Sequence, residues 1–206
     1  MTSIEQRDVQ SVLSGIDDLL PLIAKRAQAA EELRRLPDDT VNELDEVGFF
    51  KLLQPEQWGG LQCDPTVFYE AVRRIASACG STGWVSSILG VHNWHLALFD
   101  QQAQDEVWGS DSTVRVSSSY APMGAGTVVD GGYLVSGAWQ WSSGCDHATW
   151  AFLGGPVIKD GKPVDFGSFL IPASEYRIDD VWHVVGLKGT GSNTVVVKDV
   201  FVPRHR

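Results

Sequence analysis

The sequence predicts an α+β protein with two domains, helices first and strands second. Through the first half of the chain, apolar residues recur at three- and four-residue spacing, which is typical of amphipathic helices. After about Asp111 the pattern changes to alternating β-branched residues punctuated by glycine, which is typical of antiparallel strands. Helices and strands do not alternate, so βαβ units are not expected. We therefore expect an all-helical domain at residues 1–111 and an antiparallel β-barrel domain at residues 112–206.

Three helices are expected in the first part of the chain. The first begins at Val9 and carries a regular apolar stripe. The second begins at Pro37-Asp38 and ends before Gly48, because glycine is common just past the end of a helix. The third begins at Asp64-Pro65, where a capping aspartate is followed by proline in the first turn.

A fourth helix is expected to begin with Ser81 as its capping residue. Most of its circumference is apolar, so we expect it to be buried. Trp84 and His92 lie eight residues apart, about 80° around a helix, so they can flank one cavity without touching. His92 stands at the edge of an apolar stripe that consists of Trp84, Ile88, Val91, His95 and Phe99.

Strands are expected throughout the second half of the chain. Asp130-Gly131-Gly132 and Asp160-Gly161 predict tight turns, which are typical of hairpins. The segments with a strand pattern are Thr113–Ser119, Thr127–Asp130, Tyr133–Gly137 and Thr194–Val202.

Composition excludes several classes of protein. The net charge is −10 and the acidic excess lies in the first half, which argues against a nucleic-acid partner. No stretch is apolar enough for a signal peptide or a membrane span, so neither secretion nor membrane insertion is expected. Cys63, Cys79 and Cys145 are odd in number and form no Cys-x-x-Cys pair. We expect no disulfide framework, no structural zinc and a cytoplasmic location.

Three stretches in this order carry a resemblance to a known family. They are residues 47–60, which contain Val47-Gly48-Phe49-Phe50 and Trp58-Gly59-Gly60; residues 131–144, which end in Trp141-Ser142-Ser143-Gly144; and residues 186–203. The chain resembles the acyl-CoA dehydrogenase superfamily over nearly its whole length. That resemblance implies a helical domain and a β-barrel domain followed by a C-terminal four-helix bundle, which this chain does not contain.

A narrower resemblance follows from the segment at Trp141-Ser142-Ser143-Gly144, where the dehydrogenases usually carry Trp-Ile-Thr-Asn. Together with Gly83-Trp84, the His92-Asn93-Trp94-His95 segment and residues 117–124, it is similar to the oxygenase components of two-component aromatic hydroxylases. This implies reduced FMN, or else FAD, that reacts with O2 to give a C4a-hydroperoxide and ortho-hydroxylates a bulky phenol, such as a steroid-derived secosteroid. It also implies an NADH-dependent flavin reductase as electron source and a homotetramer.

The same resemblance assigns roles to individual residues. His92 would take or share the phenolic proton, and Ser143 would hold the hydrogen at flavin N5, so both are candidate catalytic residues. The candidate flavin-binding residues are Trp84, Ser118, Ser119, Tyr120, Trp141, Ser142 and Ser143.

Each assignment has a structural alternative. Serines at strand ends are commonly turn formers, and Trp141 could be packed in a core whether or not a cofactor is present. A lone histidine such as His92 is often a core residue with satisfied hydrogen bonds. His92 and His95 have the spacing of a metal pair, but no carboxylate or cysteine lies one turn away to complete a site, so no metal is expected.

Two further motifs are rejected on spacing. Gly186, Gly189 and Gly191 do not form Gly-x-Gly-x-x-Gly and are followed by a strand pattern, so no Rossmann unit is expected. Ser142 and Ser143 lack the Gly-x-Ser-x-Gly elbow of serine hydrolases. A flavin enzyme without its own nicotinamide site must receive electrons from another protein.

Two other functions stay open at this stage. An acyl-CoA dehydrogenase would use a carboxylate base, which most members carry in the C-terminal bundle. The chain could also be a structural or ligand-binding module without catalysis.

Overall fold

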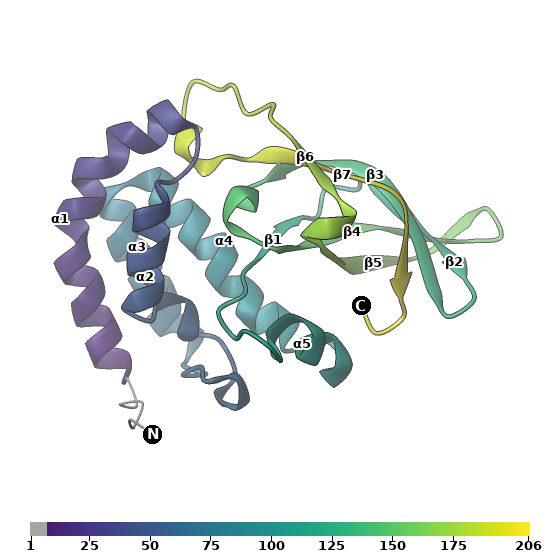
Figure 1. Cartoon of the computed structure of the whole chain (residues 1–206), viewed down its shortest axis with the longest axis horizontal. Helices are drawn as coiled ribbons and strands as arrows, with labels where there is room; N and C mark the ends of the chain where they lie inside the picture. The colour runs from purple at the N-terminus through teal and green to yellow at the C-terminus, as the bar shows by residue number, and fades with distance from the viewer. Residues whose placement is uncertain (1–7) are drawn as a thin grey trace.

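Five α-helices precede seven strands in residues 8–206, the part of the chain that the computed structural model describes (Figure 1). The helices are α1 (Val9–Leu33), α2 (Asp38–Glu46), α3 (Pro65–Ala78), α4 (Gly80–Leu96) and α5 (Gln101–Trp108). The strands are β1 (Val116–Ser119), β2 (Gly124–Val129), β3 (Gly132–Ser142), β4 (Trp150–Lys159), β5 (Lys162–Pro172), β6 (Arg177–Asp179) and β7 (Asn193–Pro203). Figure 1 shows the helices on one side of the molecule and the sheet on the other, with α4 and α5 nearest to the strands.

The first three helices begin where the sequence predicts. The Asp8 carboxylate caps α1 by accepting from the backbone N–H of Ser11, and the Asp64 carboxylate caps α3 by accepting from that of Thr66. The predicted cap of α4 is wrong: Cys79 is the capping residue, and Ser81 lies inside the helix. The reason is tertiary, because the Ser81 hydroxyl donates to the Glu31 carboxylate on α1 at 3.2 Å.

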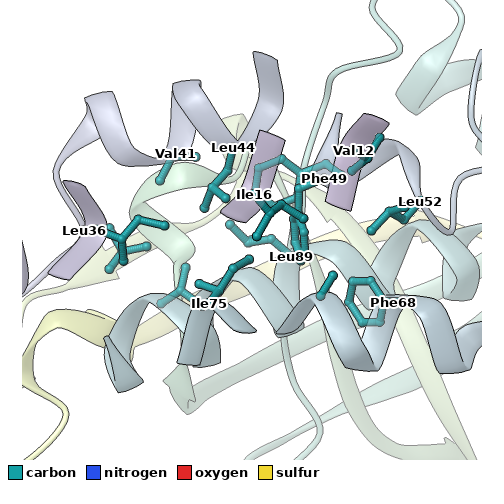
Figure 2. Close-up of a cluster of buried hydrophobic side chains, with 14 of the residues drawn as sticks. Val12, Ile16, Leu36, Val41, Leu44, Phe49, Leu52, Phe68, Ile75 and Leu89 are labelled. Atoms are coloured by element: carbon teal, nitrogen blue, oxygen red, sulfur yellow. The ribbon is translucent and has the colours of Figure 1, made fainter. Parts of the chain in front are cut away.

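The helices enclose one apolar core (Figure 2). Figure 2 shows side chains from α1, α2, α3 and α4 converging with Phe49 of a short 3₁₀ helix (Phe49–Lys51). Close helix packing depends on Gly83, since a Cβ there would lie 2.5 Å from the Cβ of Ala76 on α3. Members of this core that are almost fully buried include Val12, Ile16, Leu44, Phe49, Phe68, Ile75 and Leu89.

The strands form one mixed sheet, so the prediction of an antiparallel barrel is wrong in two respects. First, β4 runs parallel to both β1 and β2, although the β2–β3, β3–β7, β4–β5 and β6–β7 pairs are antiparallel. Second, the strand order β1-β4-β2-β3-β7-β6, with β5 beside β4, does not close on itself. Residue alternation reports which face a side chain occupies and carries no information on strand direction. The α+β class, helices followed by strands, is confirmed.

Both predicted turns are confirmed, but several strand bounds differ. Gly131 (φ 78°) joins β2 to β3, and Asp160 and Gly161 (φ 51° and 74°) join β4 to β5. Strand β1 begins at Val116 instead of Thr113, because Thr113 lies in a turn capped by the Asp111 carboxylate. Strand β3 continues to Ser142, five residues past the predicted end at Gly137. Strands β4, β5 and β6 and helix α5 have no counterpart among the predicted segments.

A separate apolar cluster joins the helices to the sheet. Trp108 of α5 and Leu96 of α4 pack with Phe152 of β4 in this cluster, and all three side chains are almost fully buried. The Trp108 indole N–H donates to the Val114 carbonyl at 3.3 Å, which holds the segment before β1 against α5. This packing places the ends of β1 and β3 beside α4.

Candidate functional site

A pocket of about 190 Å³ lies where α4 meets the ends of β1 and β3. Two of the residues that line it belong to α4, and the other six belong to β1, β3 and the residues that follow these strands. Six of the residues predicted to act in a site line it, and they come from segments almost sixty residues apart. The lining consists of Trp84, Ile88, Ser118, Ser119, Tyr120, Ala121, Trp141 and Ser143.

A hydrogen bond between Trp84 and Ser143 joins the helix to the sheet at the wall of this pocket. The indole N–H of Trp84 donates to the Ser143 hydroxyl at 2.9 Å. Most of α4 is buried, as predicted, but Trp84 remains 50% exposed. The face of α4 that packs in the core carries Val85, Leu89 and Leu96.

Ser143 belongs to a chain of hydroxyl groups. Its Oγ lies 2.8 Å from Ser192 Oγ, which in turn lies 2.7 Å from Thr190 Oγ1. Thr190 Oγ1 donates to the Leu187 carbonyl at 2.9 Å. Thr190 and Ser192 were not predicted as site residues, because this segment was interpreted only through the family resemblance of residues 186–203 and the spacing of its glycines. A run of Thr and Ser between glycines was the available signal.

Trp141 is held out from the sheet by its backbone. Its φ of 65° lies in the left-handed region, and its pairing with β7 is interrupted between Trp139 and Ser142. The side chain is 60% exposed, so the alternative of a tryptophan packed in the core is wrong. A left-handed residue other than glycine costs about 1–3 kcal/mol, and such strain often accompanies functional sites.

The serines at the strand ends differ in what they offer to a ligand. Ser118 and Ser119 line the pocket, and the Ser119 hydroxyl donates to the Gln140 carbonyl at 2.6 Å. Ser142 is fully buried and is not part of the lining, because its hydroxyl points to that of Ser117 at 3.3 Å. The structure thus brings together all predicted flavin-binding residues except Ser142.

Tyr120 links the pocket to the histidines of α4. Its hydroxyl is hydrogen bonded to Nδ1 of His95 at 2.9 Å. Burial of the phenol raises the pKa of Tyr120 to about 12, although a hydrogen bond with Ser118 opposes the rise. Burial also lowers the pKa of His95. Near neutral pH both groups are therefore uncharged.

His92 lies behind the pocket and is not part of its lining. It is 3% exposed, and its ring packs against Phe152 and Tyr120 with centroids 5.4 and 6.2 Å away. Neither ring nitrogen has a hydrogen-bond partner among residues 8–206, so the alternative of a satisfied core histidine is wrong. Burial, with a smaller effect of His95, lowers the pKa of His92 to about 3, so its imidazole is neutral.

Other kinds of site find no support in the described residues. No group of three or more His, Cys, Asp or Glu side chains there is arranged to hold a metal ion. Within the same part of the chain, no helix combines the length and the apolar character needed to cross a membrane.

Comparison with known proteins shows which proteins this chain is similar to. Residues 20–111 match the family model described as the acyl-CoA dehydrogenase N-terminal domain. The chain is 79% identical, over all 206 residues, to a flavin-dependent monooxygenase oxygenase subunit, HsaA, of Mycobacterium tuberculosis, and covers 52% of it. It is 40% identical over 198 residues to the oxygenase component of p-hydroxyphenylacetate 3-hydroxylase of Acinetobacter baumannii, with 95% of this chain and 46% of that protein covered.

Solved structures give the same result. The crystal structure of the M. tuberculosis HsaA monooxygenase superposes with a TM-score of 0.96 at 78% identity, over 97% of this chain and 55% of that one. XiaF from a Streptomyces species, in complex with FADH2 and glycerol, has a TM-score of 0.90 at 34% identity, over 96% of this chain and 50% of that one. The chain spans about half the length of the curated relatives that it matches.

Proposed function

Because residues 20–111 match the acyl-CoA dehydrogenase N-terminal domain, we propose that this chain is the flavin-contacting half of the oxygenase component of a two-component monooxygenase, which ortho-hydroxylates a bulky phenol. The observation that carries the proposal is the pocket between α4 and the sheet, where Trp84, Trp141 and Ser143 meet. The 79% identity to a flavin-dependent oxygenase subunit supports the same function.

The residues of the pocket fit a flavin ring. The exposed indole of Trp141 offers an apolar face beside the ring, and the segment Ser118–Tyr120 offers hydroxyl and backbone groups to its polar edge. Ser143 would face the N5 position. When bound, a reduced flavin activates O2 and delivers one oxygen atom to an aromatic ring. The protein must exclude water and keep the N5 hydrogen in place.

We propose FMN as the flavin, with FAD as the alternative. The family likeness favours FMN, whereas the related XiaF was solved with FADH2. Ring contacts are common to both flavins, so the lining of the pocket does not separate them.

His92 is proposed as the residue that accepts or shares the phenolic proton. Both of its ring nitrogens lack partners within residues 8–206, and a buried polar atom without a partner costs about 1–3 kcal/mol. A substrate hydroxyl that reached the histidine would supply the missing partner and relieve this cost. The neutral imidazole can accept a hydrogen bond from such a group. Contact between His92 and Tyr120 connects the histidine to the lining.

The proposed substrate is a phenol derived from a steroid, of the secosteroid type. Exposed Trp84 and Trp141 give the site broad apolar surfaces that suit such a bulky molecule. The hydroxylase of p-hydroxyphenylacetate among the relatives supports a phenolic substrate.

Partners follow from the same proposal. An oxygenase component requires a separate NADH-dependent flavin reductase, and the family likeness favours a homotetramer. A cytoplasmic location suits Cys63, Cys79 and Cys145, all of which are free thiols.

The test uses the full-length protein that contains this chain. Reduced FMN, oxygen and a phenol are mixed, and the hydroxylated product, hydrogen peroxide and flavin spectra are followed. We expect a catechol product and no flavin reduction by an acyl-CoA. Flavin reduction by an acyl-CoA without phenol hydroxylation would identify a dehydrogenase instead, and neither reaction would leave a binding module.

A further inference from the structure

In the chain of hydroxyl groups that begins at Ser143, the direction of every hydrogen bond is determined. Three oxygen–oxygen contacts, from Ser143 to Ser192, from Ser192 to Thr190 and from Thr190 to the Leu187 carbonyl, are 2.7–2.9 Å long. Each contact needs one proton, because two oxygen atoms at that distance repel each other without one. The three hydroxyl groups hold one proton each, and the carbonyl holds none.

That balance leaves a single arrangement. The Thr190 proton must go to the Leu187 carbonyl, so Ser192 must donate to Thr190, and Ser143 must donate to Ser192. At the other end, the indole of Trp84 can only donate, so Ser143 accepts from it. Ser143 has therefore used its proton and one of its two lone pairs.

The loop that carries the chain is well anchored. The backbone N–H of Gly144 donates to the Thr190 carbonyl at 2.9 Å, which ties the end of β3 to this loop. The indole of Trp182 also donates to the Leu187 carbonyl, at 3.1 Å. Ser192 and Thr190 are 4% and 2% exposed, so water does not compete for their protons.

We propose that Thr190 and Ser192 are positioning residues that hold Ser143 as a hydrogen-bond acceptor toward the pocket. This rests on the proposed function. The N5 atom of a reduced flavin carries a hydrogen and donates, whereas N5 of an oxidised flavin has only a lone pair and accepts. A serine hydroxyl that can act only as an acceptor forms a hydrogen bond with N5 of the reduced flavin. With the oxidised flavin, its lone pair would face the lone pair of N5. The hydroxyl chain thus contributes to selection of the reduced cofactor.

The test compares dissociation constants of oxidised and reduced FMN, measured anaerobically on the full-length protein. Ser192→Ala removes the acceptor of the Ser143 proton, and Thr190→Val replaces the last hydroxyl of the chain with a methyl group of similar shape. In both variants the Ser143 proton can turn to the pocket, so the ratio of the oxidised to the reduced dissociation constant should fall by about two- to tenfold. Thr190→Ser should restore the wild-type ratio.

A matched control is Ser86→Ala. Like Ser192 and Thr190, Ser86 is buried, but it lies on α4 and its hydroxyl belongs to no such chain. Its ratio should equal that of the wild type. An unchanged ratio in folded Ser192→Ala and Thr190→Val, checked by circular dichroism, would overturn the inference while the proposed function stood. Wild-type protein that bound neither form of FMN would overturn the proposed function as well.

Discussion

The indole of Trp84 on α4 donates to the hydroxyl of Ser143 at the end of β3, 2.9 Å away, and this bond joins the helical and the sheet parts of the molecule at the candidate site. The two residues are 59 positions apart in sequence. The bond lies at the wall of the pocket. It fixes the position of α4 relative to the sheet, and a ligand in the pocket must fit between them.

The bond itself can be measured by a double-mutant cycle in the full-length protein. Trp84→Phe removes the donor and keeps an aromatic side chain, and Ser143→Ala removes the acceptor together with the bond from Ser143 to Ser192. We expect a coupling free energy of about 0.5–1.5 kcal/mol in urea unfolding, the net value of a typical hydrogen bond. Additive effects of the two changes would mean that the bond contributes nothing in solution. Trp94→Phe, which alters a tryptophan equally exposed on the same helix, is the control and should show no coupling to Ser143→Ala.

Ser143→Ala should uncouple hydroxylation without abolishing flavin binding. One lost hydrogen bond costs about 0.5–1.5 kcal/mol of binding, and the ring keeps its other contacts. The N5 hydrogen loses its acceptor, and a similar energy in the barrier to its loss changes a rate by about tenfold per 1.4 kcal/mol. More hydrogen peroxide should form per NADH consumed, as a peroxide assay run beside a product assay would show. Wild-type coupling in the variant would make Ser143 a structural serine.

His92→Ala should slow hydroxylation by about 100- to 10,000-fold, the usual contribution of a general base, and leave the affinity for reduced flavin unchanged. His92→Leu should slow the reaction as much, yet unfold at the same or a higher temperature than the wild type, because two buried nitrogen atoms without partners in residues 8–206 are removed. Rapid mixing measures the rate of hydroxylation, and thermal melting measures the stability. Undiminished hydroxylation in both variants would show that His92 only fills space.

Trp141→Gly should stabilise the fold and weaken flavin binding. The left-handed backbone at φ 65° suits glycine, and relief of the strain should raise the free energy of unfolding by about 1 kcal/mol. The exposed indole contributes little packing to the core. Urea unfolding and FMN titration measure the two effects. If Trp141 has no role in binding, FMN affinity will stay at the wild-type level while stability rises.

Stability should decrease as the pH falls from about 6.5 toward 5. Burial lowers the pKa of His92 to about 3 and that of His147 to about 4, from an ordinary value of 6.5. The unfolded chain therefore binds more protons than the folded chain in this range, which favours unfolding. Arg35 and Arg115 also lower the pKa of His147, whereas Asp38 raises it.

The measurement is urea unfolding at several pH values. His147→Gln and His92→Gln should each flatten the dependence, because each removes one such group. Burial raises the pKa of Asp146, so this carboxyl acts in the opposite sense, and it is present in the wild type and in both variants alike. A dependence as steep in both variants as in the wild type would assign the effect to other groups.

Much of the helical part could be predicted because its signals are local. Helix starts at Asp64-Pro65 and Pro37-Asp38 depend on capping groups and proline within a few residues, and the structure confirms both. The cap of α4 could not be predicted in this way, because Ser81 makes its hydrogen bond with Glu31, which is fifty residues away. Tight turns at Gly131 and Gly161 were equally local.

The candidate site was predicted in part through its resemblance to known proteins. Residues 84, 118–120, 141 and 143 meet in one pocket, as expected, whereas Ser142 points to Ser117 and His92 lies behind the lining. Alternation along β3 cannot reveal this difference, because the strand pairing is interrupted between Trp139 and Ser142.

The sequence by itself determined the class of the fold, the starts of the first three helices and two tight turns, since periodicity, caps and turns act over a few residues, and its resemblance to known proteins indicated the segments from which the pocket is built. Only the tertiary structure decided that β4 lies between β1 and β2 and that the sheet is mixed. It alone also joined Trp84, Ser143, Ser192 and Thr190 in one hydrogen-bonded chain. The physical reason is that strand direction and proton direction depend on partners distant in sequence, whose positions are set by packing of the whole core.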